Sequence, residues 1–498
     1  MALLALPTKA NVPVYLRPLS FCPSRTREIG KGANRSIRLF ASSSPPLSVL
    51  SSRLDGLDKP TVWHELTPLS IEHGSVNLGQ GFPDWDPPEF CIEAMERATN
   101  PKYGRNANQY ARPNAHLALA KVLAQEYSER WEASLEGDID PLTQIATASG
   151  CTNVLYCALQ ALLDPGDEVL LLEPAFDIYS SQVTMAGGVS VYCPLRPIPA
   201  DGETTGGVTN DDNDSTATAS RAFQLDLDEL ESKITSRTKI LLLNTPHNPT
   251  GKMFSKEELT GIANIVLKYP KLIVISDEVY EHIIFEKETE PHLSIATIPG
   301  MFDRTLTLSS SGKTFSCTGW KVGWSVGPPH LVHAVVAAQQ WVNFSAVTPT
   351  QDAIAQSLEQ AKLPYRGYDT YYDYLAEDYR SKRQILMEAL SGAGMKPLLP
   401  PGSFFIMADT SSIPDEWFYD EMASKPTRAM PASPMPRDWA LARWLTQEVG
   451  VTAIPPSAFY SSPNVPLAKN LLRFAFCKNE DTLREGQRRL ESYFSSRT

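Results

Sequence analysis

Short apolar runs alternate with amphipathic stretches along the middle of the chain. The runs at 168–172, 240–243, 272–275 and 305–308 end close to Gly, Pro, Asn or Asp and are predicted to be strands. Two amphipathic stretches, 154–163 and 257–267, carry apolar residues three and four positions apart, which predicts helices packed on a sheet. This alternation predicts an α/β fold with a largely parallel sheet. Such sheets bind ligands at the carboxyl ends of their strands, so the polar residues that follow each run are the candidates for function.

Two segments interrupt this pattern and help to divide the chain. Residues 201–220 are rich in Gly, Thr, Asp and Asn, residues 411–436 are rich in Pro and Met, and both are predicted to be surface insertions. After the second segment, a helical run at 439–448, a strand at 471–476 and an amphipathic helix at 482–494 predict a smaller α+β domain. A chain of 498 residues is also too long for one compact core.

We therefore predict four parts. These are a targeting segment with its linker at 1–46, an N-terminal segment at 47–88 that contributes to the small domain, a large domain at 89–365 and a small domain at 366–498.

Composition narrows the class of protein. The chain is 42% hydrophobic and 20% charged, which is typical of a globular protein, and its net charge of −12 argues against nucleic acid as a partner. The seven cysteines are scattered without a CxxC spacing, so neither a disulfide framework nor a metal site is expected. No apolar run reaches the length needed to cross a membrane. These features favour an enzyme that acts on small molecules.

The first forty residues have a different composition from the rest. They contain seven Lys and Arg residues, a single acidic residue, Glu28, and interspersed serines. This composition is typical of a transit peptide, and a secretory signal fits less well because the positive charge follows the apolar residues Leu3 to Leu6. We expect import into the mitochondrial matrix. A disordered basic tail on a cytoplasmic protein is the alternative.

Three charged residues stand in places where an ordinary surface charge is not expected. Lys313 follows the run at 305–308 inside the glycine-containing segment 309–324, and desolvation there would lower its pKa and make it a nucleophilic amine. Asp277 ends the run that begins at 272 and can serve chemistry or cap a following helix. Arg473 lies inside the apolar run 471–476, where burial requires an anion, either a substrate carboxylate or an internal salt bridge.

The segment 309–324 resembles the Schiff-base signature of class I aminotransferases, which belong to the fold-type I pyridoxal-phosphate superfamily. The resemblance extends from about Leu54 to the C-terminus and implies a large domain with a mostly parallel central sheet plus a smaller α+β domain. It implies that Lys313 holds pyridoxal 5′-phosphate as a Schiff base and shuttles a proton. It further implies that Asp277 pairs with the pyridine nitrogen, and that Tyr280 and Asn248, the latter in the turn Asn-Pro-Thr-Gly, contact the phenolic oxygen.

The same resemblance assigns the remaining site residues. Phe176 is implied to stack on the cofactor ring, and Arg473 to bind the α-carboxylate of the substrate, for which a guanidinium group is well matched. Two groups complete the site. The phosphate ligands are Gly150, Cys151, Thr152, Ser310, Lys321 and, from a partner subunit, Tyr110, and the substrate contacts are Trp63, Gly81 and Asn248. The role of Tyr110 implies a homodimer with shared active sites.

The substrate is the less specific part of the resemblance. Many family members have Arg where Lys321 stands, and Lys is typical of the subgroup of kynurenine aminotransferases and glutamine transaminases. We therefore predict transfer of an amino group from kynurenine, or a related aromatic or sulfur amino acid, to a 2-oxo acid. A methionine or glutamine transaminase and a cysteine-S-conjugate β-lyase are alternatives, and a non-catalytic regulator that binds the cofactor is a remote one. Ala346 and Val347 stand where the subgroup has a Phe-His pair, which predicts a roomier, less polar side-chain pocket.

Overall fold

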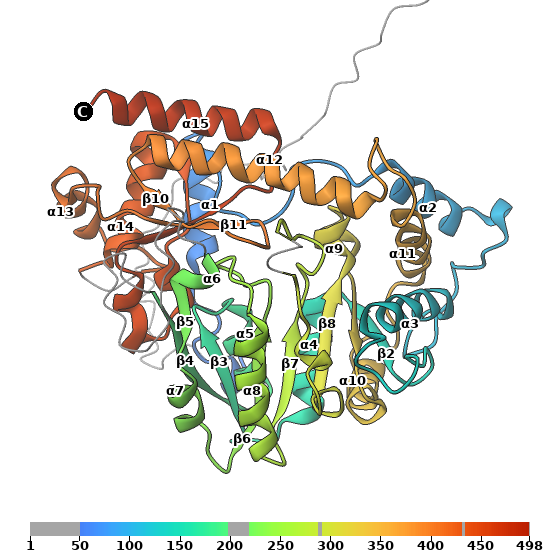
Figure 1. Cartoon of the computed structure of the whole chain (residues 1–498). Coiled ribbons are helices and arrows are strands. Elements are labelled where there is room, and N and C mark those ends of the chain that lie inside the picture. The colour runs from blue at the N-terminus through green and yellow to red at the C-terminus, as the bar shows by residue number, and fades with distance from the viewer. Residues whose placement is uncertain (1–49, 198–218, 287–290, 431–433, 498) are drawn as a thin grey trace, which may run out of the picture. The chain divides into compact units, whose positions relative to one another are not determined.

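The fold is built on a mixed sheet of eight strands. The structure is a computed structural model that describes residues 50–197, 219–286, 291–430 and 434–497, and 50–498 is one compact unit (Figure 1). The sheet has the order β2 (Ile145–Ser149), β9 (Val322–Val326), β8 (Thr305–Ser310), β7 (Ile273–Asp277), β6 (Thr238–Asn244), β3 (Glu168–Glu173), β4 (Val189–Pro197) and β5 (Phe223–Leu225).

The central strands β8, β7, β6, β3 and β4 run parallel, while β9 and β5 pair antiparallel with their neighbours. The four predicted strands are confirmed as β3, β6, β7 and β8, and so are the α/β class and the largely parallel sheet.

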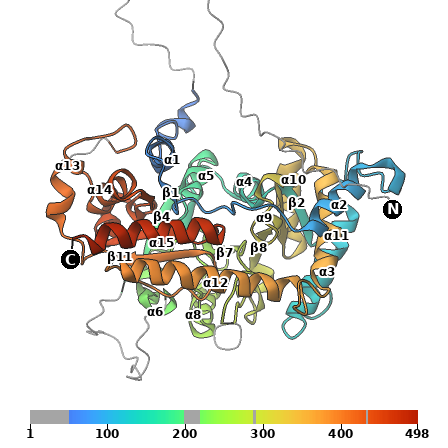
Figure 2. The same cartoon turned by 90° about the horizontal axis from the view of Figure 1, so that it is seen from above.

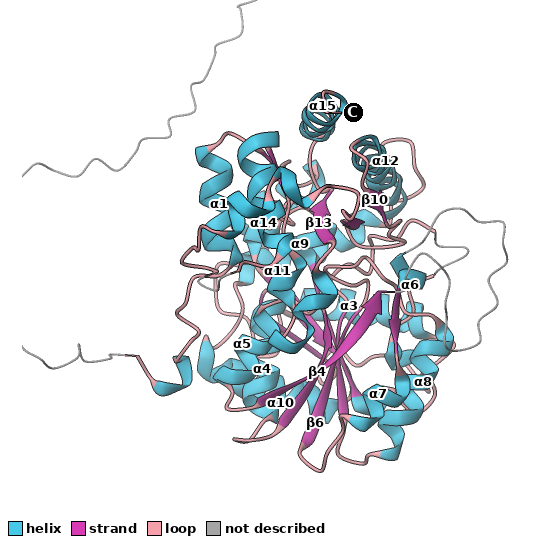
Figure 3. Ribbon diagram, turned by 90° about the vertical axis from the view of Figure 1, so that its left-hand side faces the viewer, coloured by secondary structure: helices cyan, strands magenta, loops and turns pink. Residues whose placement is uncertain are grey.

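Both faces of this sheet are covered by helices (Figure 3). One face packs against α4 (Cys151–Leu162), α5 (Ile178–Met185) and α10 (Pro329–Val342), and the other against α7 (Leu227–Ser232) and α8 (Lys256–Lys268). In β6, Ile240 and Leu242 enter the first core, whereas Leu241 and Leu243 enter the second. Alternation of side chains across a strand that is buried on both faces explains why these runs are apolar without interruption.

A second layer brings together the two ends of the described chain. The antiparallel sheet β10 (Lys396–Pro397), β11 (Phe405–Asp409) and β13 (Leu471–Ala475) lies beside α12 (Tyr371–Gly392) and α15 (Glu480–Ser495), which run next to each other (Figure 2). The N-terminal strand β1 (Val76–Asn77) pairs with β12 (Val451–Thr452). This pairing agrees with a contribution of 47–88 to the C-terminal part, although the division into two domains stays a prediction.

Three further helices lie at the β2 edge of the large sheet. They are α2 (Glu89–Thr99), α3 (Leu117–Trp131) and α11 (Thr348–Ala361), and α11 packs against both of the others. Helix α1 (Val62–Glu72) carries Trp63, and α14 (Arg437–Trp444) continues into a π-helical turn, η7 (Leu445–Val449). None of the described helices is long and apolar enough to cross a membrane.

One predicted insertion is part of the core. The segment 411–436 contains η6 (Asp415–Trp417) and α13 (Tyr419–Ala423), and it buries Phe418, Met422 and Met435. The prediction of a surface insertion is therefore wrong here, because apolar side chains spaced among the prolines pack against α14. The other insertion, 201–220, falls almost entirely outside the described residues, as does the basic segment at 1–40.

Candidate active site

A cavity of about 510 Å³ lies at the carboxyl ends of β6, β7 and β8. Its lining includes every predicted site residue except Tyr110: Trp63, Gly81, Gly150, Cys151, Thr152, Phe176, Asn248, Asp277, Tyr280, Ser310, Lys313, Lys321 and Arg473. These residues are as far apart in sequence as 63 and 473. The cavity lies where the rule that ligands bind at the carboxyl ends of parallel strands predicts a site.

Lys313 lies in the short helix α9 (Ser311–Thr314), which follows β8 directly. Its Nζ donates a hydrogen bond to the carbonyl oxygen of Gly81 at 3.0 Å, and burial lowers its pKa below the ordinary value. The turn is tight, since a Cβ atom at Gly312 would lie 3.0 Å from Cα of Thr318. Lys313 is thus held in the cavity wall with a larger fraction of its amine neutral, as a nucleophile requires.

Asp277 ends β7 with its side chain 7% exposed. Burial raises the pKa of its carboxyl group, while hydrogen bonds from the hydroxyl group of Tyr179 at 2.7 Å and the backbone N–H of Val279 at 3.3 Å favour the charged form. The alternative that Asp277 caps a helix is wrong, because turns rather than a helix follow β7. Tyr280 comes from these turns, and burial raises its pKa, so its hydroxyl group stays protonated.

Arg473, on β13, is 1% exposed and reaches the same cavity. Its Nη1 donates to Oδ1 of Asn248 at 2.9 Å and its Nη2 to the carbonyl oxygen of Gly79 at 2.7 Å. Among the described residues no carboxylate oxygen lies within 4.0 Å of it, so the alternative of an internal salt bridge is wrong. Burial lowers the pKa of Arg473 to about 10, and the guanidinium carbon lies 4.3 Å from the ring centre of Phe405.

The opposite end of the cavity is built to receive an anion. Gly150, with φ of 86°, precedes the first turn of α4, whose free N–H groups attract negative charge. A Cβ atom at Gly150 would lie 3.1 Å from Nζ of Lys321, so the glycine leaves room for the lysine at the helix terminus. Ser310 and Thr152 add hydroxyl groups to this wall.

The structure adds residues that sequence reasoning missed. Tyr179, as described, donates to Asp277, and Asp177 accepts a hydrogen bond from Nε1 of Trp63 at 2.9 Å. Both follow β3 within the segment that supplied Phe176, so their place after a strand was the available signal. Phe405 had no such signal, since β11 reaches the cavity only through the antiparallel pairing with β13.

Three residues named from the sequence lie outside this cavity. Tyr110 is 85% exposed and its ring packs edge-on against Phe344 at 5.3 Å. Ala346 is buried and Val347 is 52% exposed at the start of α11. Neither Ala346 nor Val347 lines the cavity, so the expectation that they shape the side-chain pocket is wrong for the cavity of the same chain.

This fold and this site define an aminotransferase. A lysine with a lowered pKa, a buried carboxylate and an arginine that has no carboxylate partner among the described residues meet in one cavity on a largely parallel sheet. Residues 74–490 match the family described as aminotransferase class I and II, and the chain belongs to this family.

Its relatives cover most of the chain. The kynurenine–oxoglutarate transaminase of Dictyostelium discoideum is 42% identical over 86% of this chain and 92% of its own length. Kynurenine–oxoglutarate transaminase 1 of Homo sapiens is 38% identical over 89% of this chain and 97% of its own. Among solved structures, YbdL of Escherichia coli, for which a methionine aminotransferase function has been identified, superposes with a TM-score of 0.73 at 30% identity, covering 90% of this chain and all of YbdL.

Proposed function

We propose that this aminotransferase uses pyridoxal 5′-phosphate to transfer the amino group of kynurenine, or of a related aromatic or sulfur amino acid, to a 2-oxo acid. The observation that carries the proposal is the placement of Lys313, Asp277 and Arg473 around one cavity of about 510 Å³. The names of the relatives, which are kynurenine–oxoglutarate transaminases at 38% and 42% identity, support the choice of substrate.

The described residues fit this cofactor. A phosphate group needs donors at one end, and the backbone of Gly150 and Cys151 at the start of α4, the hydroxyl group of Ser310 and the ammonium group of Lys321 supply them. A protonated pyridine nitrogen needs a carboxylate, and Asp277 is a buried carboxylate in the cavity wall.

Each residue would then have a distinct task. When bound, pyridoxal phosphate supplies an aldehyde that condenses with amines and a ring that accepts the electrons of the Cα–H bond. Asp277 would keep a proton on the ring nitrogen, and Lys313 would hold the cofactor and carry the proton removed from Cα. Arg473 would bind the α-carboxylate with two parallel hydrogen bonds, and its planar fork suits this geometry.

The aromatic lining favours apolar and aromatic side chains on the substrate. Trp63 and Phe405 line the cavity around Arg473, and the guanidinium carbon lies 5.5 Å from the ring centre of Trp63. The methionine aminotransferase function identified for YbdL keeps methionine as a second candidate donor. Loss of a Cβ leaving group as a thiol would instead indicate β-lyase activity.

The test is a substrate panel on the purified full-length protein with added cofactor. Kynurenine, phenylalanine, methionine and glutamine are each combined with two or three 2-oxo acids, and both the new amino acid and any released thiol are measured. We expect amino transfer with kynurenine or phenylalanine as good donors. Absence of turnover with bound cofactor would contradict the proposal and favour a regulator.

We further propose a homodimer in which Tyr110 serves the partner's site. Tyr110 packs against Phe344, which is 48% exposed, and two further exposed apolar side chains, Trp341 at 84% and Val347 at 52%, lie within three residues of Phe344 in the chain. A patch of this kind is typical of a protein interface.

Two measurements test the homodimer. Trp341→Glu should give monomers in sedimentation velocity, whereas the control Ile71→Glu, at a 78% exposed position on α1, should not. Mixed dimers of Tyr110→Ala and Lys313→Ala chains should regain activity, because one of their two sites has both residues. No recovery would contradict shared sites.

We also propose import into the mitochondrial matrix, supported by the basic, serine-containing composition of residues 1–40. A fusion of residues 1–46 to a fluorescent protein should enter mitochondria. Cytoplasmic fluorescence of this fusion would contradict the proposal.

A further inference from the structure

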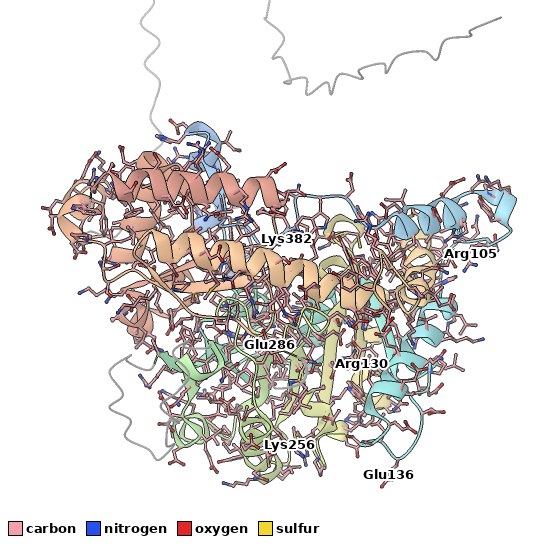
Figure 4. The ribbon with its side chains drawn as sticks, turned by 45° about the horizontal axis from the view of Figure 1, so that its top comes forward. Arg105, Arg130, Glu136, Lys256, Glu286 and Lys382 are labelled. Carbon is pink, nitrogen blue, oxygen red and sulfur yellow. The ribbon has the colours of Figure 1, made fainter. Side chains whose placement is uncertain are left out.

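Glu281 lies on the side of the turn after β7 that faces away from the active-site cavity. Asp277 at the end of β7 and Val279 and Tyr280 of this turn line the active-site cavity, whereas Glu281 lines a second cavity of about 380 Å³ together with Arg130 of α3. The side chain of Glu281 is 1% exposed. Arg130 is labelled in Figure 4 and belongs to the helix that flanks the large sheet at the β2 edge.

The carboxylate of Glu281 collects donors from two other elements. It accepts hydrogen bonds from Nη1 of Arg130 at 2.7 Å, from the hydroxyl group of Tyr127 at 3.0 Å, and from the hydroxyl group of Ser309 on β8. Tyr127 in turn accepts a hydrogen bond from Nε1 of Trp324 on β9 at 3.1 Å. Burial alone would raise the pKa of Glu281, but the charges of Arg130 and His282 and the hydrogen bonds from Ser309 and Arg130 lower it to about 2, so the group is ionised.

These contacts lie at the point where β7 and β8 stop pairing with each other. The paired register of β7 and β8 ends at Asp277 and Leu308, and one further backbone bond joins the N–H of Glu278 to the carbonyl oxygen of Leu308. Beyond this point β7 and β8 no longer pair with each other: β7 leads into the turn with Tyr280, while β8 stays paired with β9 up to Ser310 and then leads into α9 with Lys313. The hydrogen bond from Ser309 to Glu281 is a side-chain link between the two turns.

We propose that Glu281 is a positioning residue. Held by its hydrogen bonds from Arg130 and Tyr127, and bonded to Ser309, it fixes the turn that carries Tyr280 relative to the turn that carries Lys313. The inference rests on the proposed function, because it concerns the geometry of that reaction. Catalytic groups lose efficiency steeply when misplaced, since a displacement of about 1 Å can cost on the order of a hundredfold in rate. A buried carboxylate that accepts from three donors resists such displacement better than a single pair.

Ser309→Ala and the control Ser294→Ala separate positioning from stability. Both serines are buried and both donate to a buried glutamate, but Ser294 donates to Glu278 at 2.7 Å and not to Glu281. We expect Ser309→Ala to lower kcat by about tenfold, an intermediate loss on the scale of such misplacements. Its KM should stay within about twofold, because the proposed carboxylate ligand Arg473 lies on the other sheet. Ser294→Ala should keep kcat near the wild-type value at a similar unfolding temperature. Equal losses of kcat in the two variants would overturn the proposal.

A second measurement does not depend on turnover. In the cofactor-free full-length chain, competitive acylation with peptide mapping gives the pKa of Lys313. Because burial lowers this pKa, a loosened turn should raise it in Ser309→Ala and in Glu281→Gln, but not in Ser294→Ala. An unchanged pKa in Ser309→Ala would refute the positioning role even if the wild-type protein had a different activity. If the wild-type protein were inactive but Ser309→Ala still raised the pKa of Lys313, the result would contradict the proposed reaction and support the positioning role.

Discussion

Replacing Arg473 with methionine tests whether this residue binds substrate or holds the fold together. Methionine has a similar length and no charge, so the change removes both Nη donors and leaves the space filled. In the structure these donors contact Oδ1 of Asn248 and the carbonyl oxygen of Gly79, and no carboxylate lies within 4.0 Å among the described residues. If Arg473 binds substrate, the substitution should lower activity much more than stability. If Arg473 holds the fold together, the substitution should lower stability strongly.

The expected effect of the substitution on the free energy of unfolding follows from the burial of Arg473. Burial lowers the pKa of Arg473 from 12.5 to about 10, and one pKa unit corresponds to about 1.4 kcal/mol, so keeping this charge costs the fold about 3 kcal/mol. The folded-state pKa lies below the unfolded-state value, so the cost is present at every pH below about 10 and disappears only as the pH rises toward the ordinary pKa of arginine. Methionine removes this cost but leaves two acceptors without a donor, at about 1–3 kcal/mol each. Together these terms give a net destabilisation between about −1 and 3 kcal/mol, with a midpoint near 1 kcal/mol, whereas breaking a buried ion pair costs about 3–5 kcal/mol.

The magnitude for activity is larger. Two hydrogen bonds between a guanidinium and a carboxylate are worth about 3–6 kcal/mol together, which corresponds to a decrease in kcat/KM of about 10²–10⁴-fold for amino acids and oxo acids alike. The assay compares kcat/KM for kynurenine and for its decarboxylated amine, with thermal unfolding as the control. Arg473→Lys should fall between, because an ammonium group keeps the charge without the fork. Equal losses for both substrates, together with a destabilisation of 3–5 kcal/mol, would refute the assignment and indicate a structural role.

Three further predictions concern the cofactor end of the site. Lys313→Ala should abolish turnover, whereas the control Lys382→Ala on α12 should keep it. Borohydride reduction of the wild-type protein with pyridoxal phosphate should label Lys313 alone in peptide maps. Label on another lysine would contradict the assignment. Asp277→Asn should bind the cofactor yet lose about 10²–10³-fold in kcat, because an amide cannot stabilise a pyridinium charge, and near-normal turnover would show a purely structural role. Tyr179→Phe removes a hydrogen bond that lowers the pKa of Asp277, so this pKa should rise further. The acidic limb of the pH–kcat profile should then move to higher pH. An unchanged limb would show that Asp277 does not control it.

Much of the fold and site was predictable because it depends on local signals. The apolar runs that became β3, β6, β7 and β8 are buried on both faces, so their sequences are continuously apolar and easy to identify. Lys313 and Asp277 directly follow such runs, and parallel strands end at the same edge of a sheet. The prediction of a surface insertion at 411–436 was wrong, because the apolar side chains that pack into the core stand among prolines and polar residues.

The sequence by itself determined the class of fold, the strands that carry the site and the type of chemistry at Lys313, since hydrophobic period and residue type act over a few neighbouring positions. Only the tertiary structure decided which partners these residues have. Within the part of the chain that the structure describes, it excluded an ion pair for Arg473 and a helix cap for Asp277. It also placed Tyr110 and Val347 outside the cavity and joined Glu281 to Ser309. Such contacts form between elements that are distant in the chain, and the energies that select them depend on packing and burial in three dimensions, which no local pattern records.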